Sequence, residues 1–285
     1  MDARIIVCTH KPYDLPEDDL YLPLQVGAAI SEPIDRKSCR LTSGDPAKGE
    51  YLQGDDTGEN ISEKNGTFCE LTGLYWAWRN LDHKVLGLVH YRRQFTVKSA
   101  AFIHRFGKMR ALLTADEVDG LFRRYDIIVP TKRRYYIETL FSHYDHTLDG
   151  SPLLIARDII AKHDRGYLPF LERVYRRRWG YMFNMMLMRK EEIDAYCTWL
   201  FDILDKMEER LAADGTLDRM TAFEKRLFGR VSEILFNVWL EKRRVEGVRI
   251  GEVKYLPMEN EQWHKKIPAF LAAKFTGKKY KGSFG

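Results

Sequence analysis

The sequence of 285 residues lacks the features on which several protein classes depend. Its 4 cysteines, Cys8, Cys39, Cys69 and Cys197, form no C-x-x-C pair. This spacing argues against a disulfide framework or a zinc site and predicts buried thiols in a reducing compartment. No apolar run reaches the roughly 20 residues that a transmembrane helix needs. The first residues show no signal-peptide pattern, so we expect a cytoplasmic protein.

Common nucleotide-binding and catalytic signatures are absent as well. The sequence contains no P-loop, no G-x-G-x-x-G fingerprint and no G-x-S-x-G elbow. These absences argue against a kinase, a dehydrogenase and an α/β-hydrolase. The net charge is +5 at pH 7, but no RNP, zinc-finger or helix-turn-helix pattern accompanies it. Nucleic acid is therefore not an expected partner.

The composition is that of a globular protein, with one exception near the C-terminus. Hydrophobic residues make up 45% and charged residues 31% of the chain, enough to bury a core. We expect a domain over residues 1–258 and a basic tail over residues 259–285, where six lysines and no acid follow His264. Two roles for the tail stay open. It is either solvated or in contact with anionic lipid, with Phe270, Leu271, Phe275 and Phe284 at the interface.

The apolar pattern alternates between short strands and longer helices. Short runs predict strands at residues 4–9, 85–89, 126–130 and 181–188. Periodicity and capping signals predict helices at residues 62–81, 114–124, 151–177, 190–212 and 223–245. Residues 31–60 predict a long loop with one short strand at most. This alternation predicts an α/β fold with a mostly parallel sheet covered on both faces.

Cationic clusters follow three of the predicted strands. They are Thr9–His10–Lys11, His90–Tyr91–Arg92–Arg93 and Lys132–Arg133–Arg134. Ligands of such sheets bind outside the carboxyl ends of the strands. Because like charges repel unless an anion lies among them, and arginine matches phosphate oxygens, the clusters predict a di- or polyphosphate ligand. The alternative is that each cluster is a solvated loop.

Polar residues crowd the start of the predicted helix at residues 62–81. They are Asn60, Glu63, Lys64, Asn65 and Glu70. Helix capping accounts for one or two of them. The number of polar side chains favours recognition of a polar ligand such as a ribose or a base.

Two acidic or histidine-containing segments raise the question of a metal. Asp55 and Asp56 could hold a divalent cation, or form a turn of solvated acids. His143 and His146, with Asp145 and Asp149, have a loose metal-site spacing that also suits a surface loop. We assign no metal ligand and leave Mn²⁺ and Mg²⁺ open as cofactors.

Longer blocks of sequence resemble a known family. The blocks are DDTGENISEKN at residues 55–65, CELTGLYWAWRN at 69–80, GLVHYRR at 87–93, CTHK at 8–11 and RVSEIL at 230–235. Together they resemble a bacterial family long catalogued as domain of unknown function 4422, whose members are capsular or exopolysaccharide glycosyltransferases. The resemblance extends from about residue 4 to residue 258.

The resemblance implies a fold and a reaction. The fold is a single Rossmann-like domain similar to the A-type glycosyltransferases, with a helical C-terminal part. In that fold an Asp-x-Asp motif usually holds a metal against the donor diphosphate, whereas this sequence has His90–Tyr91–Arg92–Arg93 at the similar place. We therefore expect Arg92 and Arg93 to be catalytic and to stabilise the leaving nucleoside diphosphate in place of a metal.

Further site residues are expected for the same reaction. Glu233 is the expected base for an acceptor hydroxyl, unless it is only a capping or surface residue. The residues expected to bind the donor are Thr9, His10, Lys11, Asn60, Lys64, Asn65, His90 and Tyr91. Trp76 and Asn184 are expected to face the acceptor, although core packing is the commoner role of a tryptophan.

The expected function is transfer of a sugar from a nucleotide-sugar donor. The resemblance implies a donor linked to UDP, with galactose in either ring form, and a glycan or lipid-linked glycan acceptor. Such a transferase would be cytoplasmic, with peripheral attachment to the inner face of the plasma membrane left open. Two alternatives remain, a nucleotide-sugar hydrolase or phosphotransferase, and a non-catalytic module that binds anionic polysaccharide.

Overall fold

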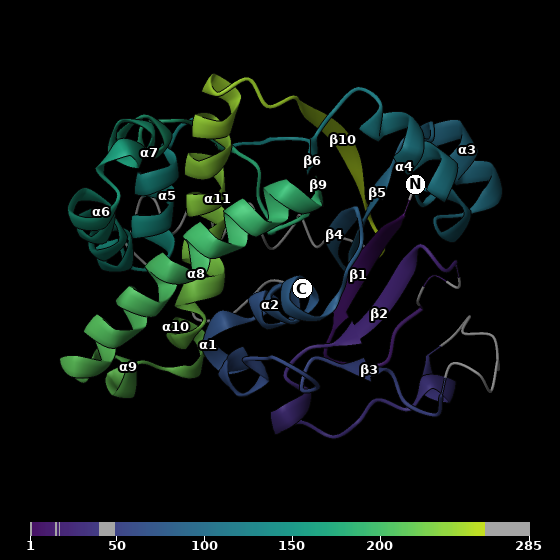
Figure 1. Cartoon of the computed structure of the whole chain (residues 1–285), viewed down its shortest axis with the longest axis horizontal. Helices are drawn as coiled ribbons and strands as arrows, with labels where there is room; N and C mark the ends of the chain where they lie inside the picture. The colour runs from purple at the N-terminus through teal and green to yellow at the C-terminus, as the bar shows by residue number, and fades with distance from the viewer. Residues whose placement is uncertain (1, 15, 17, 40–48, 260–285) are drawn as a thin grey trace. The chain divides into compact units, whose positions relative to one another are not determined.

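A computed structural model describes residues 2–14, 16, 18–39 and 49–259, which form two compact units (Figure 1). Unit 1 contains the chain up to Thr131, Asn184–Cys197 and Val248–Glu259. Unit 2 contains Lys132–Phe183 and Thr198–Gly247. The domain predicted over residues 1–258 thus holds two compact units. The predicted basic tail lies outside the described residues, apart from Glu259.

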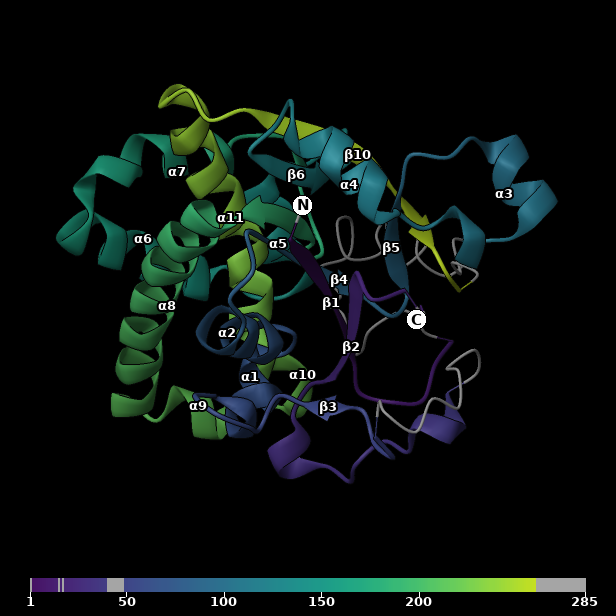
Figure 2. The ribbon, with the colours of Figure 1, turned by 45° about the vertical axis from the view of Figure 1, so that its right-hand side comes forward.

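Unit 1 is built on an eight-stranded sheet. Its strands are β1 (Ala3–Thr9), β2 (Tyr21–Gln25), β3 (Gln53–Gly54), β4 (Val85–His90), β5 (Arg93–Thr96), β6 (Ile127–Pro130), β9 (Met186–Arg189) and β10 (Ile250–Pro257). Their order is β3-β2-β1-β4-β5-β10-β6-β9, and β9 also pairs with β4. The five strands β4, β5, β10, β6 and β9 therefore close into a ring. β1, β2 and β3 extend from this ring, with β1 and β2 side by side (Figures 1 and 2).

The sheet is mixed, whereas the sequence predicts a mostly parallel one. β1 is parallel to β2 and β4, and β10 is parallel to β6. β5 and β9 are antiparallel to both of their neighbours. β5 follows β4 after only two residues, Tyr91 and Arg92, and so short a connection permits only antiparallel pairing. The α/β class itself is observed.

The core of unit 1 lies around β1 and β4. Ile5, Ile6 and Val7 are at most 1% exposed, without the alternation of a strand that faces water on one side. Helix α2 (Leu71–Asn80) contacts both strands. The helix predicted over residues 62–81 is broken, because Cys69 takes a left-handed φ of 54° between α1 (Asn65–Phe68) and α2.

The other helices of unit 1 are short. They are α3 (Ala100–Phe106) and α4 (Ala115–Phe122). The capping box predicted at the start of α4 is confirmed, since the Thr114 hydroxyl accepts from the Glu117 N–H and the Glu117 carboxylate accepts from the Thr114 N–H. These reciprocal bonds fix where the helix begins.

Unit 2 is mainly helical. It contains α5 (Leu140–Thr147), α6 (Ser151–His163), α7 (Leu168–Tyr175), α9 (Thr216–Arg219), α10 (Ala222–Lys225) and α11 (Leu227–Val245), with a ribbon of β7 (Arg133–Arg134) and β8 (Trp179–Gly180). The helix predicted over residues 151–177 is divided into α6 and α7 by a 3-10 turn at Arg165–Tyr167. Helix α8 (Lys190–Ala213) begins in unit 1 and ends in unit 2.

The two long helices bury the predicted faces. The residues predicted to point inward are all at most 2% exposed: Ile193, Tyr196, Leu200, Ile203 and Leu204 on α8, and Leu227, Val231, Leu235, Val238 and Trp239 on α11. The strand predicted at residues 181–188 is correct only from Met186, because Phe183 and Asn184 have φ values of 77° and 50°. In the part of the chain that the structure describes, each helix is too short or too polar to span a lipid bilayer.

Candidate functional site

The carboxyl ends of β1 and β4 are neighbours in unit 1. Cys8 on β1 is in parallel register with His90 on β4, and the Tyr91 N–H donates to the Cys8 carbonyl over 3.2 Å. This register places the residues after both strands at one edge of the sheet. The first two cationic clusters predicted from the sequence therefore lie side by side.

The Tyr91 ring is the centre of this edge. It is 5% exposed, and the rings of His10 and Tyr13 approach it edge-on, with centroid distances of 5.5 and 4.8 Å. Lys11 Nζ and the Arg92 guanidinium carbon each lie 5.3 Å from the Tyr91 centroid. Cation–π contacts of this kind contribute about 0.5–1 kcal/mol each at exposed sites. We call His10, Lys11, Tyr13, Tyr91 and Arg92 the Tyr91 cluster.

Short turns hold the two cations of the cluster. Thr9 is 1% exposed, and its hydroxyl donates to the Lys11 carbonyl over 2.6 Å, which bends the chain directly after β1. Arg92 occupies the two-residue turn between β4 and β5, and its carbonyl accepts from the Met258 N–H over 2.9 Å. Both cations therefore rest on a backbone that is hydrogen-bonded to the sheet or to its own turn.

The electrostatics of the cluster favour an anion. Lys11 Nζ is 3.7 Å from a carboxylate oxygen of Glu259, a partly solvated pair that contributes little. Arg92 makes no ion pair with a carboxylate in the described part of the chain. Burial raises the pKa of Tyr13 to about 12, so its phenol stays neutral at pH 7 and can donate to a phosphate oxygen.

The neighbouring predicted residues have partly structural roles. His90 ends β4 and its carbonyl accepts from Gln94 Nε2 over 3.2 Å. Arg93 begins β5, is half-buried, and is in register with Pro257 of β10. The donor-binding role of His90 and the catalytic role of Arg93 stay predictions.

Asp55 organises the loop after β3. It is 0% exposed, and its carboxylate accepts from the N–H groups of Gly27 and Ala28, at 3.1 and 3.0 Å, and from the Ser62 hydroxyl. Asp56 is exposed. The Asp55 carboxylate thus holds the loop, and within the described ranges no three histidine, cysteine or acidic side chains are arranged to hold a metal ion.

The asparagines expected to bind the donor also hold this loop. Asn60 Nδ2 donates to the carbonyls of Asp56 and Gly58, each over 3.0 Å. Asn65 Nδ2 donates to the Cys69 carbonyl over 2.8 Å. Lys64 is half-buried, with its Nζ 5.5 Å from the centroid of the Phe68 ring. Contact of these three side chains with a nucleotide stays a prediction.

Trp76 and Asn184, expected at the acceptor, are both buried in unit 1. Trp76 is 5% exposed and donates from Nε1 to the Thr57 carbonyl over 2.9 Å. Asn184 is 0% exposed, and its Nδ2 donates to Glu70 over 2.8 Å. Contact of either residue with an acceptor stays a prediction.

Glu233, the expected base, lies in unit 2. It is half-buried on α11, and its carboxylate accepts from the Phe183 N–H over 3.0 Å. The helix begins at Leu227 with Arg226 as N-cap, so Glu233 does not cap it. A carboxylate held by a backbone N–H has a fixed direction, which a proton acceptor needs.

The third cationic cluster, residues 132–134, falls in unit 2, whereas the first two lie in unit 1.

The histidine segment has a partner that its spacing did not reveal. The Nδ1 atoms of His143 and His146 lie 3.0 and 2.6 Å from the carboxylate of Glu138, whereas Asp145 accepts from the Gly150 N–H. Glu138 is 3% exposed, and burial lowers the pKa of His143 to about 4. Sequence spacing missed Glu138 because it lies before the helix that carries both histidines.

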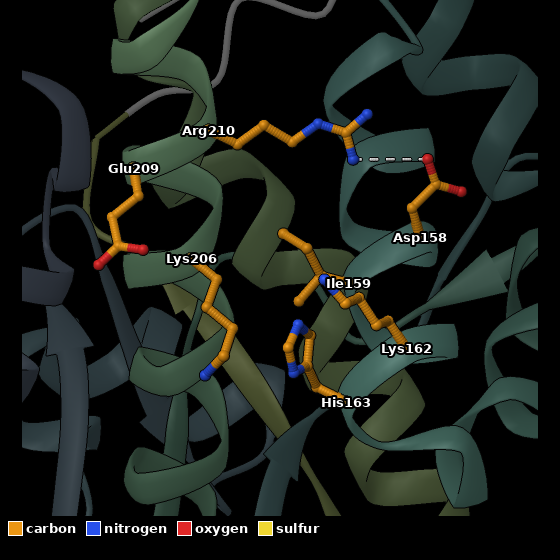
Figure 3. A pocket seen from close by; sticks show the side chains of 7 residues that line it. All are labelled: Asp158, Ile159, Lys162, His163, Lys206, Glu209 and Arg210. Carbon is orange, nitrogen blue, oxygen red and sulfur yellow. Dashed lines mark ion pairs between the residues drawn. The ribbon is translucent and has the colours of Figure 1, made fainter.

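A groove of about 480 Å³ lies in unit 2, lined by Asp158, Ile159, Lys162, His163, Lys206, Glu209 and Arg210 (Figure 3). The side chains come from α6 and α8, and Arg210 lies 3.5 Å from Asp158 across the groove. Lys206 pairs with Asp202. The Arg210–Asp158 pair joins the two helices, whereas the Lys206–Asp202 pair lies within α8, and the groove contains none of the predicted site residues.

Comparison with known proteins assigns the family. Residues 4–244 match the family described as domain of unknown function (DUF4422), and the chain belongs to that family. Comparison with curated proteins gives no match. Among solved structures, the fold is similar to the apo structure of WbbM, a bifunctional glycosyltransferase, with a TM-score of 0.77 and 27% identity over 91% of this chain. The chain spans only 46% of the WbbM chain.

Proposed function

We propose that this chain is a glycosyltransferase that moves a sugar from a nucleoside-diphosphate donor to a saccharide acceptor. The observation that carries the proposal is the Tyr91 cluster, in which Lys11 and Arg92 both contact the Tyr91 ring where β1 and β4 end. Similarity to a bifunctional glycosyltransferase supports the same reaction class. The expected alternatives of a hydrolase and a binding module lack such support.

In the proposed reaction the donor diphosphate binds at the Tyr91 cluster. Breaking the glycosidic bond leaves negative charge on the diphosphate, and fixed cations stabilise that charge without reorganising. Arg92 offers two parallel N–H donors, Lys11 adds a point charge, and the neutral Tyr13 hydroxyl donates a further hydrogen bond. Thr9 and His10 lie beside the nucleotide. Arg93 and Arg92 together supply the positive charge that a metal ion supplies to the donor diphosphate in A-type glycosyltransferases.

We further propose that Glu233 removes the proton from the acceptor hydroxyl. Its carboxylate is oriented by the Phe183 N–H. Glu233→Gln keeps an oxygen for that hydrogen bond but lacks the basic charge. Transfer should therefore fall by about 10² or more, while the affinity for the nucleotide stays unchanged. Unaltered turnover would exclude the role.

The finer identity of the substrates is also a proposal. The family resemblance supports a UDP-linked donor, with galactose in pyranose or furanose form, and a lipid-linked capsular or exopolysaccharide acceptor. That acceptor would place the enzyme at the cytoplasmic face of the plasma membrane.

Because Arg92 and Arg93 are proposed to replace the metal, turnover should persist in the presence of a chelator. Complete loss that manganese restores would overturn this part.

A thermal-shift and turnover experiment tests the function. UDP and UDP-galactose should raise the melting temperature, because a ligand that binds only the folded state stabilises it. Arg92→Ala should abolish the shift, whereas Arg123→Ala, at the exposed end of α4, should not. Incubation with the UDP-sugar alone should release little free sugar. Rapid release without an acceptor would instead favour a hydrolase, and no nucleotide binding at all would refute the proposal.

A further inference from the structure

A positively charged surface of unit 2 surrounds the β7–β8 ribbon. Arg133 and Arg134 form β7, and both are exposed. Arg178 is exposed directly before β8, and its carbonyl accepts from the Tyr135 N–H over 2.8 Å. The chain after β7 then exposes Tyr136 and Ile137. We call Arg133, Arg134, Tyr136, Ile137 and Arg178 the β7–β8 patch.

The charge of the patch is not neutralised. Within the described ranges, none of its three arginines forms an ion pair with a carboxylate. Glu138, the next acid along the chain, is buried and held by two histidine rings. Three arginines without a carboxylate partner give this surface a net positive charge, which attracts an anionic partner.

The patch also presents apolar side chains to solvent. Tyr136 is 75% exposed and Ile137 is 49% exposed. Tyr136 has a left-handed φ of 52°, which is costly for a bulky residue, and its carbonyl accepts from Arg178 Nη1 over 3.1 Å. Strained residues held by their surroundings are typical of functional positions.

We propose that the β7–β8 patch docks unit 2 on an anionic lipid surface. The arginine forks match headgroup phosphates, the tyrosine ring suits the headgroup level, and the isoleucine reaches toward the acyl chains. An acidic glycan or a nucleic acid offers charge and hydroxyl groups, but no apolar layer for Ile137. The proposal does not rest on glycosyltransfer, since no residue of the patch belongs to the Tyr91 cluster.

Co-sedimentation of the full chain with vesicles tests the patch. The vesicles contain phosphatidylcholine alone or with phosphatidylglycerol, and every variant keeps residues 259–285. Arg133→Glu with Arg134→Glu should lower partition onto the anionic vesicles at least about tenfold, because each basic residue contributes about fivefold near such a surface. Tyr136→Asn keeps the charge and a residue that tolerates left-handed backbone, and should lower partition severalfold.

The control changes the same charge on another surface. Arg105→Glu with Arg110→Glu alters two exposed arginines of unit 1, near the 41% exposed Phe106. This pair should keep vesicle binding, and all variants should melt at similar temperatures. Equal losses in patch and control variants, or no loss in the Arg133 and Arg134 double variant, would overturn the proposal. A loss of binding to an acidic polysaccharide with vesicle binding intact would assign the patch to glycan instead.

Discussion

Gly58 illustrates a single residue whose backbone the loop requires. Its φ is 57°, and an added Cβ would lie 2.0 Å from Asn80 Oδ1, the atom that accepts from the Glu59 N–H. We expect Gly58→Ala to lower the free energy of unfolding by about 1–3 kcal/mol, measured by urea denaturation. Gly120→Ala is the control, since nothing lies within 4 Å of its added Cβ on α4, and should raise stability by about 0.5–1 kcal/mol.

His143 couples the stability of the chain to pH. Burial lowers its pKa to about 4, below the ordinary value of 6.5, so the folded protein keeps the ring neutral while the unfolded chain takes up a proton. Stability is therefore lost as the pH falls from about 6.5 to about 4, by about 2–3 kcal/mol. Urea denaturation between about pH 6.5 and pH 4 should show a smaller loss of unfolding free energy for His143→Gln than for wild type. His104→Gln, at an exposed histidine, is the control and should lose as much as wild type. An identical pH dependence in wild type and His143→Gln would contradict the assignment.

At the scale of elements, Asp126 ties three strands of the ring together. It directly precedes β6, and its carboxylate accepts from Arg189 of β9 and from Arg249, which directly precedes β10. The hydrogen bonds from Arg249 are the main reason that the pKa of Asp126 is lowered to about 2. The carboxylate thus stabilises the fold while it is ionised.

Asp126→Asn tests this tie between strands. At pH 7 the variant should lose about 1–2 kcal/mol of unfolding free energy, with solvent screening included. Because the folded pKa is depressed, the contribution is complete above about pH 4 and vanishes as the pH falls to about 2. Urea denaturation at pH 7 and at pH 2 should therefore show a difference in unfolding free energy between wild type and Asp126→Asn only at pH 7. Asp119→Asn, which removes a solvated pair at 3.8 Å from Arg123, should change little at either pH.

The sequence predicts those elements whose signals are local. The apolar runs of β1, β4 and β6 and the periodicity of α8 and α11 each identify an element by themselves. β10 was missed although its residues alternate between buried and exposed, and its pairing with strands more than a hundred positions earlier has no local signal. The mixed sheet could not be predicted because β5 and β10 were missed.

The residues of the candidate site were also predictable only where the signal is local. Position after a buried strand identified Lys11 and Arg92, and parallel register brings them together. Tyr13 and Met258 were missed, because they reach the cluster through a turn and through the end of β10. Asn60 and Asn65 were predicted to bind the donor, but their side-chain amides donate to backbone carbonyls near the helix start, a structural role that composition does not reveal.

For the whole molecule, the proposed donor site predicts where ligand protection appears. Hydrogen-exchange mass spectrometry with and without UDP should show slower exchange at the ends of β1 and β4 in unit 1. The helices α6 and α7 of unit 2 should change less. Arg92→Ala should remove the protection, and protection confined to unit 2 would contradict donor binding at the Tyr91 cluster.

The closed ring of strands constrains when the protein can fold during synthesis. β10 lies between β5 and β6, yet it is the last strand of the ring to leave the ribosome. Until Pro257 has emerged, β5 and β6 each retain an open edge that another nascent chain could pair with. Unit 1 therefore cannot complete its fold before β10 has been synthesised, although most of its residues precede unit 2 in the chain. Stalling translation just before Ile250 should leave a chaperone-dependent, protease-sensitive intermediate, whereas extension past β10 should release it.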